Sequence, residues 1–491
     1  MYEYYKPLRN LMRTFSIEGS LAIIGECSHH IVADGPRPAI QGADGVDLRS
    51  SLYPYQLMLL CREILLHAVP QGTRTLANWN DFAAASNAIG KYADLVSPAS
   101  PSNIQLELHR IAQQQLPLQK RLSVSRFMRY IHVYQHADVA RIFERAIEIP
   151  VRDFAFLGFI AFSQFSKCAR FVTSVDLTCL GISDIHRDRF FRRMTASVEE
   201  LRVEFKKVQA FDHTWQYTFN ALSDRPLINV DPLHPDRVYG PIPERVLTRF
   251  TESVFYLLHG QEGFATAFGK AFEAHIDAVI VRACASPSVV VYRESPFRLG
   301  KNIYHGVDFI ISDSTGNVFV ECKTKRLGLA GQIAVTQQEL DNELEIAAGA
   351  IVQNYGNLDR ALKGKSHWTP NGLPSVNVVV TLEDWNLLTP DSFSRLADKV
   401  AASLAAKGLG ELLEKVPYVL TSSETFESAC CAINLDSIAG VFGSSFSAPR
   451  GGWYLAASLQ RDHRQANLKS QQLFIDEFKR YGEAFAGQFG S

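Results

Sequence analysis

The sequence predicts an α/β protein whose C-terminal half contains a mixed sheet and whose N-terminal half is mainly helical. Three observations favour this fold class. Apolar residues recur at three- and four-residue spacing up to about residue 220, as in SSLYPYQLMLLCREILLHA and VARIFERAIEI. Short apolar runs typical of strands are few in that region and become frequent further along the chain. A proline-rich segment separates the two kinds of sequence.

The proline-rich segment DRPLINVDPLHPDRVYGPIPE, residues 224–244, is the predicted domain boundary. Its five prolines exclude a continuous helix and argue against a central strand. We therefore predict a mainly helical N-terminal domain for recognition or regulation at 1–228, a linker at 229–243 and an α/β domain at 244–491.

The region after the boundary contains the expected elements of the mixed sheet. A helical hairpin over 243–258 and 264–280 precedes three strand candidates, SVVVYR, VDFIIS and NVFVECK. The turn sequence DSTGN joins the last two strands, which predicts an antiparallel hairpin. A long helix after Gly331 then leads to the apolar strand SVNVVVTL, and a further helix leads to VPYVLT. The order helix, three strands, helix, strand is typical of a mixed sheet with helices on its faces.

Composition excludes several classes of protein. The 491 residues are 46% hydrophobic and 21% charged, which is ordinary for a globular chain with more than one core. Fifty Lys and Arg balance 51 Asp and Glu, so no overall positive field attracts nucleic acid. The eight cysteines include no C-x-x-C pair, which indicates neither a zinc site nor a disulfide framework.

The sequence also gives no sign of export or of a membrane span. The start MYEYYKPLRNLMRTF lacks the apolar core and cleavage site of a signal peptide. The most apolar run, FAFLGFIAFSQF at 154–165, has about half the length that a bilayer span needs. We expect a cytoplasmic protein with no membrane partner.

Charged residues inside a predicted strand require a chemical explanation. Glu321 and Lys323 lie in NVFVECK and, because strand side chains alternate, point to the same side of the sheet. The hairpin brings Asp308, at the mouth of VDFIIS, to the same end. Two converging carboxylates repel each other unless a hard divalent cation lies between them, and Mg²⁺ fits best, with Mn²⁺ as the expected substitute. Lys323 could then stabilise negative charge on a reacting phosphate, which suits phosphodiester hydrolysis.

This arrangement resembles the PD-(D/E)xK nuclease superfamily, which has the restriction-endonuclease-like fold. The resemblance rests on Asp308 followed on the next strand by Glu321-Cys322-Lys323, and it covers about residues 245–430. Glu273 on the preceding helix resembles the glutamate that many members add to the metal site. Val307 stands where many members have proline, and Gln353 and Tyr355 lack the Gln-x-x-x-Tyr spacing of the exonuclease branch.

The resemblance implies a magnesium-dependent deoxyribonuclease, most simply an endonuclease, with a restriction-endonuclease-like C-terminal core. The catalytic residues would be Asp308, Glu321, Lys323 and Glu273, and the metal ligands would be Asp308, Glu321, Cys322 and Glu273. A catalytic domain joined to an unrelated sensing region also resembles bacterial restriction and antiviral defence proteins. The implied partners are DNA and either a second copy of the chain or another defence protein.

Three further residues are predicted to contact nucleic acid. Lys325 and Arg326 follow the motif strand and would neutralise phosphate, and His305 precedes the first motif strand. Arginines and aromatics also alternate at 120–130 and 186–194, where we favour solvated helix faces with aromatics in the core over nucleic-acid contact.

Alternatives remain for the motif itself. Asp308, Glu321 and Lys323 could form a surface hairpin with a weak ion pair. The corresponding alternative functions are a non-catalytic nucleic-acid-binding scaffold of the same fold and an RNase.

Overall fold

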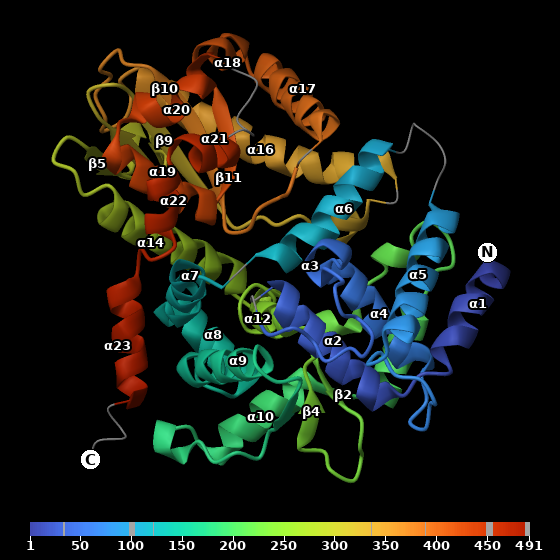
Figure 1. The fold of residues 1–491 in the computed structure, drawn as a ribbon. Helices are drawn as coiled ribbons and strands as arrows, with labels where there is room; N and C mark the ends of the chain where they lie inside the picture. The colour runs from blue at the N-terminus through green and yellow to red at the C-terminus, as the bar shows by residue number, and fades with distance from the viewer. Residues whose placement is uncertain are drawn as a thin grey trace.

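The computed structural model describes residues 1–32, 35–97, 104–120, 122–334, 336–387, 389–447 and 455–486. Figure 1 shows the N-terminal helices, blue to green, beside a sheet whose strands and covering helices run from yellow-green to red. The α/β class is therefore confirmed. Among the described helices, none combines the length and apolarity that crossing a membrane requires.

The N-terminal half is mainly helical, as predicted. Its helices are α1 (Tyr2–Met12), α2 (Ile17–Val32), α3 (Leu48–Ser51), α4 (Pro54–His67), α5 (Trp79–Val96), α6 (Ile104–Gln119), α7 (Val124–Gln135), α8 (Ala137–Ile147), α9 (Val151–Phe165), α10 (Asp184–Met194) and α11 (Val198–Val208). Helix α8 buries Val139, Phe143 and Ile147, spaced by four residues along one stripe. Helix α11 begins with a capping box in which Ser197 and Glu200 satisfy each other's backbone N–H groups.

The proline-rich segment contributes strands to a small sheet, which corrects one sequence expectation. The sheet has the order β1-β4-β3-β2, with β1 (Arg170–Val172), β2 (Thr195–Ser197), β3 (Leu227–Asn229) and β4 (Arg237–Tyr239). Strands β3 and β4 are central although the segment is rich in proline. Each is only three residues long, and all five prolines lie outside the strands, so none removes a ladder hydrogen bond.

The C-terminal half contains a five-stranded mixed sheet with the order β11-β10-β9-β8-β5. The strands are β5 (Val290–Arg293), β8 (Phe309–Ser312), β9 (Asn317–Lys323), β10 (Ser375–Thr381) and β11 (Tyr418–Ser422). Strands β5, β8 and β9 pair antiparallel, whereas β9, β10 and β11 pair in parallel. The predicted hairpin is confirmed by the register, in which Phe309 lies opposite Val320.

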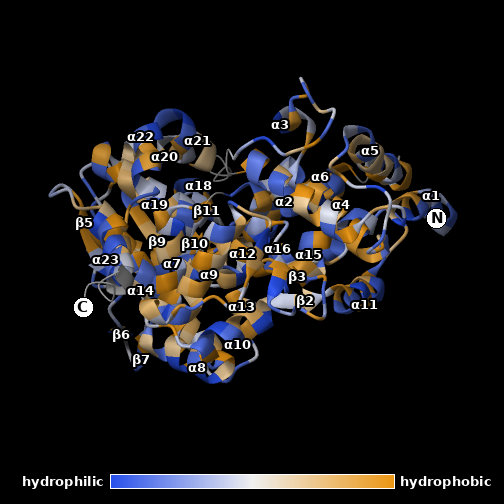
Figure 2. Cartoon of the chain, turned by 60° about the horizontal axis from the view of Figure 1, so that its bottom comes forward, coloured by the Kyte–Doolittle hydropathy of each residue, from blue (hydrophilic) through white to orange (hydrophobic). Residues whose placement is uncertain are grey.

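Helices cover both faces of this sheet. The helices of the C-terminal half are α12 (Pro243–Phe250), α13 (Val254–Leu258), α14 (Phe264–Ala283), α15 (Leu329–Ile333), α16 (Gln337–Leu362), α17 (Pro390–Ala406), α18 (Gly410–Lys415), α19 (Ser423–Leu435), α20 (Ile438–Ser447), α21 (Leu455–Asp462), α22 (Arg464–Ser470) and α23 (Ile475–Ala486). On one face Val318 and Val320 share a hydrophobic cluster with Phe272 of α14. On the other face Phe319 clusters with Ile351 of α16. Orange, hydrophobic residues accordingly dominate β9 and β10 in Figure 2.

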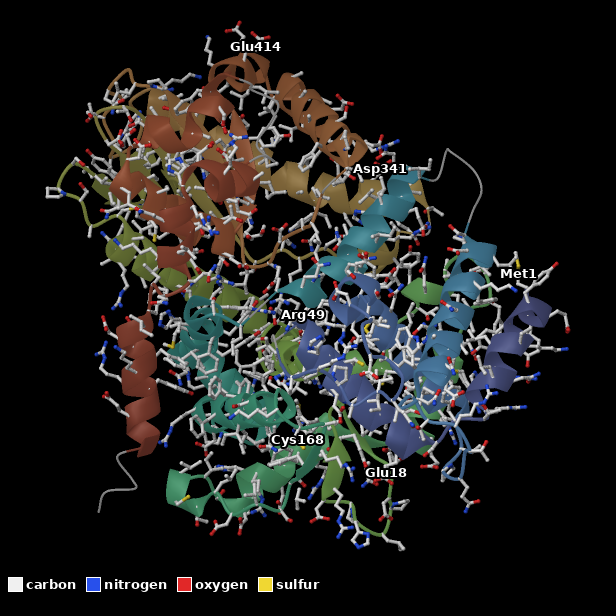
Figure 3. The ribbon with its side chains drawn as sticks, in the orientation of Figure 1. Met1, Glu18, Arg49, Cys168, Asp341 and Glu414 are labelled. Carbon is white, nitrogen blue, oxygen red and sulfur yellow. The ribbon has the colours of Figure 1, made fainter. Side chains whose placement is uncertain are left out.

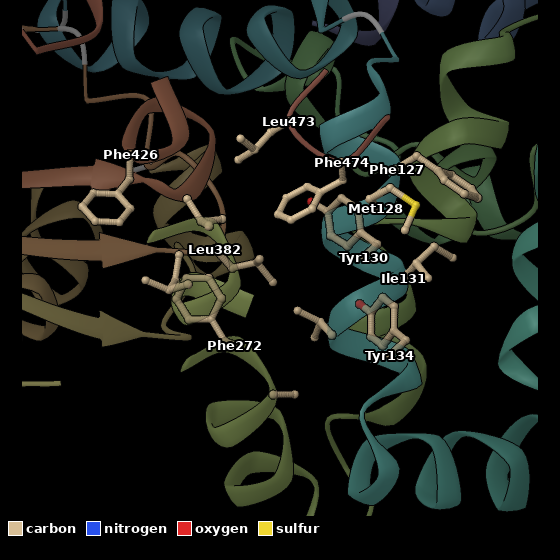
Figure 4. Close-up of a cluster of buried hydrophobic side chains, with 14 of the residues drawn as sticks. Phe127, Met128, Tyr130, Ile131, Tyr134, Phe272, Leu382, Phe426, Leu473 and Phe474 are labelled. Carbon is tan, nitrogen blue, oxygen red and sulfur yellow. The ribbon is translucent and has the colours of Figure 1, made fainter. Parts of the chain in front are cut away.

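One hydrophobic cluster extends across the predicted domain boundary. Figure 4 shows Phe127, Tyr130 and Tyr134 of α7 packed in the same cluster as Phe272 and Phe426 from the C-terminal half. A second contact involves α6, whose His109 ring is 2.8 Å from the Gly331 carbonyl oxygen. The limits at 228 and 244 stay a prediction, and the core does not stop at them.

The outer surface carries most of the charge. In Figure 3 the side chains of Met1 and Glu18 project from the N-terminal helices, and Glu414 projects at the other end of the molecule.

The arginine- and aromatic-rich segments at 120–130 and 186–194 were expected to have solvated helix faces, and this expectation fails in one respect. Their aromatics Tyr130 and Phe190 are buried, as predicted, but Arg126 and Arg129 are buried as well. Each arginine is paired, Arg126 with Glu252 and Arg129 with a carboxylate of α19.

Candidate active site

The β8–β9 hairpin places Asp308 beside the predicted motif strand. Because Phe309 pairs with Val320, the preceding Asp308 lies opposite Glu321 at the end of the ladder. Its Oδ2 atom accepts a hydrogen bond from the Cys322 backbone N–H at 2.6 Å. The two acids are therefore brought together by local pairing of neighbouring strands, as the sequence predicted.

Glu321 and Lys323 point to the same side of β9 and pair directly. The Lys323 Nζ atom donates to Glu321 Oε1 at 2.7 Å, with side chains that are 23% and 6% exposed, respectively. The other oxygen of Glu321, Oε2, is buried and makes no hydrogen bond of ordinary length among the described residues, although Asn357 approaches the carboxylate closely enough for hydrogen bonding to lower its pKa. A buried carboxylate oxygen without a full hydrogen bond is costly, so this atom marks a position that a cation or a donor would satisfy.

The pKa values of the acids show the cost of placing them together. Burial, and then the charge of Glu321, raises the pKa of Asp308 to about 7, against the lowering effect of the Cys322 N–H. Burial also raises the pKa of Glu321 despite the neighbouring Lys323 ammonium. Both carboxyl groups thus hold their protons more tightly than usual, which is the behaviour expected of converging acids without a counter-cation.

Glu273 of α14 lies at the edge of this group. It is more exposed than the other two acids, and its pKa is raised by partial burial and then by the charge of Glu321. The charge of Lys323 acts on it in the opposite direction. The structure therefore places Glu273 within electrostatic range of Glu321 and Lys323.

Sequence reasoning missed Glu294, a further acid at the site. Glu294 follows β5, and its backbone N–H donates to the Asp308 carbonyl oxygen at 2.9 Å. Its charge raises the pKa of both Glu273 and Glu321. The sequence contained the information needed to find Glu294. Extending the hairpin register to a third antiparallel strand, β5, places Glu294 beside Asp308.

Two residues of α16 were also missed. Asn357 donates from Nδ2 to the Gly306 carbonyl oxygen at 3.0 Å and lies close enough to lower the pKa of Glu321. Arg360, one turn later, donates to the Asn357 side-chain oxygen and lies over the Tyr304 ring, 5.2 Å from its centroid. Only the packing of α16 across the sheet brings these residues to the site.

The three residues predicted to contact nucleic acid differ in their exposure. Lys325 is exposed, and His305 is exposed with its Nδ1 atom 2.7 Å from Glu294 Oε1. The side chain of Arg326 is only 9% exposed. Its guanidinium donates to the Glu252 carbonyl oxygen at 2.8 Å and lies over the Phe255 ring at 4.5 Å. Arg326 is therefore used inside the protein and does not present its charge to a phosphate at the surface.

The donor set fits a hard cation. Asp308 and Glu321 offer carboxylate oxygens, which suit Mg²⁺ and Mn²⁺. The Cys322 thiol is buried, and burial and the charge of Asp308 raise its pKa well above its usual range, so its backbone carbonyl is the donor that suits this cation. Within the described ranges, no group of three or more His, Cys, Asp or Glu side chains is arranged to hold a metal. Two carboxylates are enough for Mg²⁺, which keeps several waters.

Comparison with protein-family models, with curated proteins and with solved structures found no match for this chain.

Proposed function

We propose that the protein is a metal-dependent nuclease that hydrolyses phosphodiester bonds, most simply as a DNA endonuclease. The observation that carries the proposal is the convergence of Asp308 and Glu321 at the end of the β8–β9 ladder, with the Lys323 ammonium 2.7 Å from Glu321 on the same strand face.

The order of elements supports the resemblance to the restriction-endonuclease-like fold. Helix α14 precedes the antiparallel strands β5, β8 and β9, and α16 then crosses to the parallel strand β10. This order places the two acids at the ends of adjacent antiparallel strands. It is the arrangement that the motif requires.

Each residue has a distinct proposed role. Asp308, Glu321 and the Cys322 carbonyl would hold Mg²⁺ or Mn²⁺, with Glu273 as a further candidate. A bound cation of this kind supplies Lewis acidity and lowers the pKa of water. Glu321 Oε1 holds the Lys323 ammonium inside the site, where its charge stabilises the negative charge that develops on a phosphate.

Two alternatives compete with this function. A non-catalytic scaffold of the same fold would have no use for the raised pKa values, which cost stability. An RNase would use the same residues, because the chemistry does not depend on the sugar. In either case the N-terminal helices are proposed to recognise a substrate, a partner or a trigger, in a restriction or antiviral defence role, and a homodimer would allow both strands to be cut.

The proposal is tested by incubating the purified full chain with plasmid DNA, linear duplex DNA, single-stranded DNA and RNA, each with Mg²⁺, with Mn²⁺ and with excess chelator. We expect cleavage of duplex DNA that requires a divalent cation. We also expect Mg²⁺ to raise the melting temperature of the wild type and not that of Glu321→Gln, since a ligand stabilises only the state that binds it. Cleavage that persists in chelator would exclude the proposed mechanism.

A further inference from the structure

A second, smaller hairpin emerges directly beside the candidate active site. Strands β6 (Phe297–Leu299) and β7 (Asn302–Tyr304) form a two-stranded sheet of their own between β5 and β8. Gly300 and Lys301 join them, and the positive φ of Gly300, 62°, suits the first position of a two-residue hairpin turn. The hairpin ends four residues before Asp308. In Figure 2 its strands lie at the lower left edge of the molecule.

The hairpin has an anchored face and a free face. Phe297 lies opposite Tyr304, with ring centroids 6.1 Å apart, and the Arg360 guanidinium of α16 covers the Tyr304 ring. Arg298 lies opposite Ile303 on the other face. Both side chains are exposed, Ile303 by 59%.

The free face and the turn of the hairpin carry positive charge. Residues 295–306, SPFRLGKNIYHG, contain Arg298 and Lys301 and no acid. Within the part of the chain that the structure describes, neither makes an ion pair, whereas the nearby Arg293 pairs with Asp277 at 2.7 Å. The two cations on the hairpin are therefore available to an external anion.

The base of the hairpin lies beside the acids of the site. His305 links it to Glu294, and Asp308 follows three residues later. A phosphate backbone approaching these carboxylates is repelled unless cationic side chains hold it nearby. The hairpin supplies such side chains at the position where the substrate has to be held.

We propose that the β6–β7 hairpin binds the major groove of duplex DNA next to the phosphate to be cut. The inference rests on the proposed function and narrows its substrate to B-form duplex DNA. The major groove of B-DNA, about 12 Å wide, admits a two-stranded ribbon, whereas the groove of an A-form RNA duplex is too narrow and deep. Arg298 and Lys301 contact phosphates or guanine edges, and Ile303 faces the apolar methyl groups of thymine.

Binding of a labelled duplex DNA to the full chain, measured by fluorescence anisotropy in chelator, tests this inference without requiring cleavage. The test variant is Arg298→Ala with Lys301→Ala. The matched control is Lys206→Ala with Lys207→Ala on α11, which lies at the opposite edge of the molecule in Figure 2. We expect the hairpin variant to bind DNA at least tenfold more weakly, with the slope of log K against log salt reduced by about two. The control should bind like the wild type, and binding of a duplex RNA of equal length should not respond to the hairpin variant.

The outcomes separate this inference from the proposed function. If the wild type cleaves DNA with metal and the hairpin variant binds it equally well, the hairpin assignment is wrong and the nuclease stands. If the wild type neither binds nor cleaves duplex DNA, both the hairpin assignment and the proposed DNA nuclease function are wrong. An equal loss of affinity in the control pair also overturns the assignment, because the effect is then one of total charge. The charge-reversing substitution Lys301→Glu in the exposed turn repeats the test without altering either strand. If this variant binds duplex DNA as tightly as the wild type, the hairpin assignment is wrong.

Discussion

Two buried groups of charged residues in this protein are built in opposite ways. In the first, between α7 and α19, Arg129 donates to both oxygens of Glu427, at 2.8 and 2.9 Å. Although burial alone would raise it, these contacts hold the pKa of Glu427 at about 2. In the second, on β9, burial leaves the pKa of Glu321 raised despite Lys323, and its Oε2 atom makes no hydrogen bond of ordinary length among the described residues.

The difference teaches how to separate a structural ion pair from a functional one. A buried pair is tolerated when its geometry is complete, and removing one partner then leaves an uncompensated charge. The Arg129–Glu427 pair is complete, and it joins α7 of the N-terminal half to α19 of the C-terminal half. The Glu321–Lys323 pair is incomplete, which costs stability and is typical of a site that awaits a ligand.

The largest expected effect comes from removing α7 altogether. The predicted boundary implies that residues 244–491 fold alone, whereas the shared cluster implies that this fragment exposes apolar surface and leaves Glu427 without Arg129. We expect 244–491 to be insoluble or to unfold without a cooperative transition, whereas the full chain unfolds cooperatively. Calorimetry of the fragment and the full chain checks this, and a cooperative transition for 244–491 would restore the sequence-based boundary.

Breaking the complete pair should be the most damaging single substitution. Arg129→Met leaves buried Glu427 with only the His275 ring, whose Nε2 atom is 3.4 Å from Glu427 Oε1, and we expect it to reduce the free energy of unfolding by about 3–5 kcal/mol. Arg129→Met with Glu427→Gln should recover part of this loss, because the orphaned charge is then absent. Urea denaturation of the two variants measures the difference. An Arg129→Met variant as stable as the wild type would show that the pair does not hold the two halves together.

Breaking the incomplete pair should affect cleavage and leave stability nearly unchanged, because Glu321, whose pKa is already raised, can take up a proton once Lys323 is removed. We expect Lys323→Ala to lower kcat by about a hundredfold, equivalent to about 3 kcal/mol of lost charge stabilisation, with a melting temperature within a few degrees of the wild type. Lys399→Ala, which removes a lysine paired with Glu345 on the outside of the protein, is the matched control. If Lys323→Ala cuts as fast as this control, the pair on β9 is only an ion pair.

Asp308 should make the metal-free protein less stable as the pH rises. Its folded pKa, about 7, lies above its unfolded value, so the protonated form favours folding and this contribution is lost between about pH 4 and pH 7. We expect Asp308→Asn to raise the free energy of unfolding at pH 8 by on the order of 2 kcal/mol in chelator, and to change little at pH 4. In Mg²⁺ the wild type should instead be more stable than Asp308→Asn, since only the wild type keeps the Asp308 carboxylate as a metal ligand.

Asp313 provides a control of opposite sign for that experiment. Burial tends to raise its pKa, but hydrogen bonds from the backbone of Ile438 and from Thr315 keep the pKa below its usual range. Its contribution is present at neutral pH and lost in acid, so Asp313→Asn should destabilise the protein at pH 8. If Asp308→Asn and Asp313→Asn change the free energy of unfolding equally at pH 8, the inferred difference between these two acids is wrong.

The hairpin with its acids could be predicted from the sequence because its information is local. Two short apolar runs and the turn DSTGN between them determine the register of β8 against β9, and that register places Asp308 opposite Glu321. The helical N-terminal half and the strands β10 and β11 follow from periodicity for the same reason. The β6–β7 hairpin was missed, although its Gly300-Lys301 turn carried a local signal.

Only the tertiary structure decided which distant residues share an environment. Asn357 and Arg360 reach the site because α16 packs across the sheet, and Arg326 is buried because α13 lies against it. The burial of α7 in the same core as β9 contradicts the impression of independence that a proline-rich segment gives. The physical reason is that hydrophobic burial is non-directional, so periodicity reveals that a face is apolar without revealing which other face will cover it.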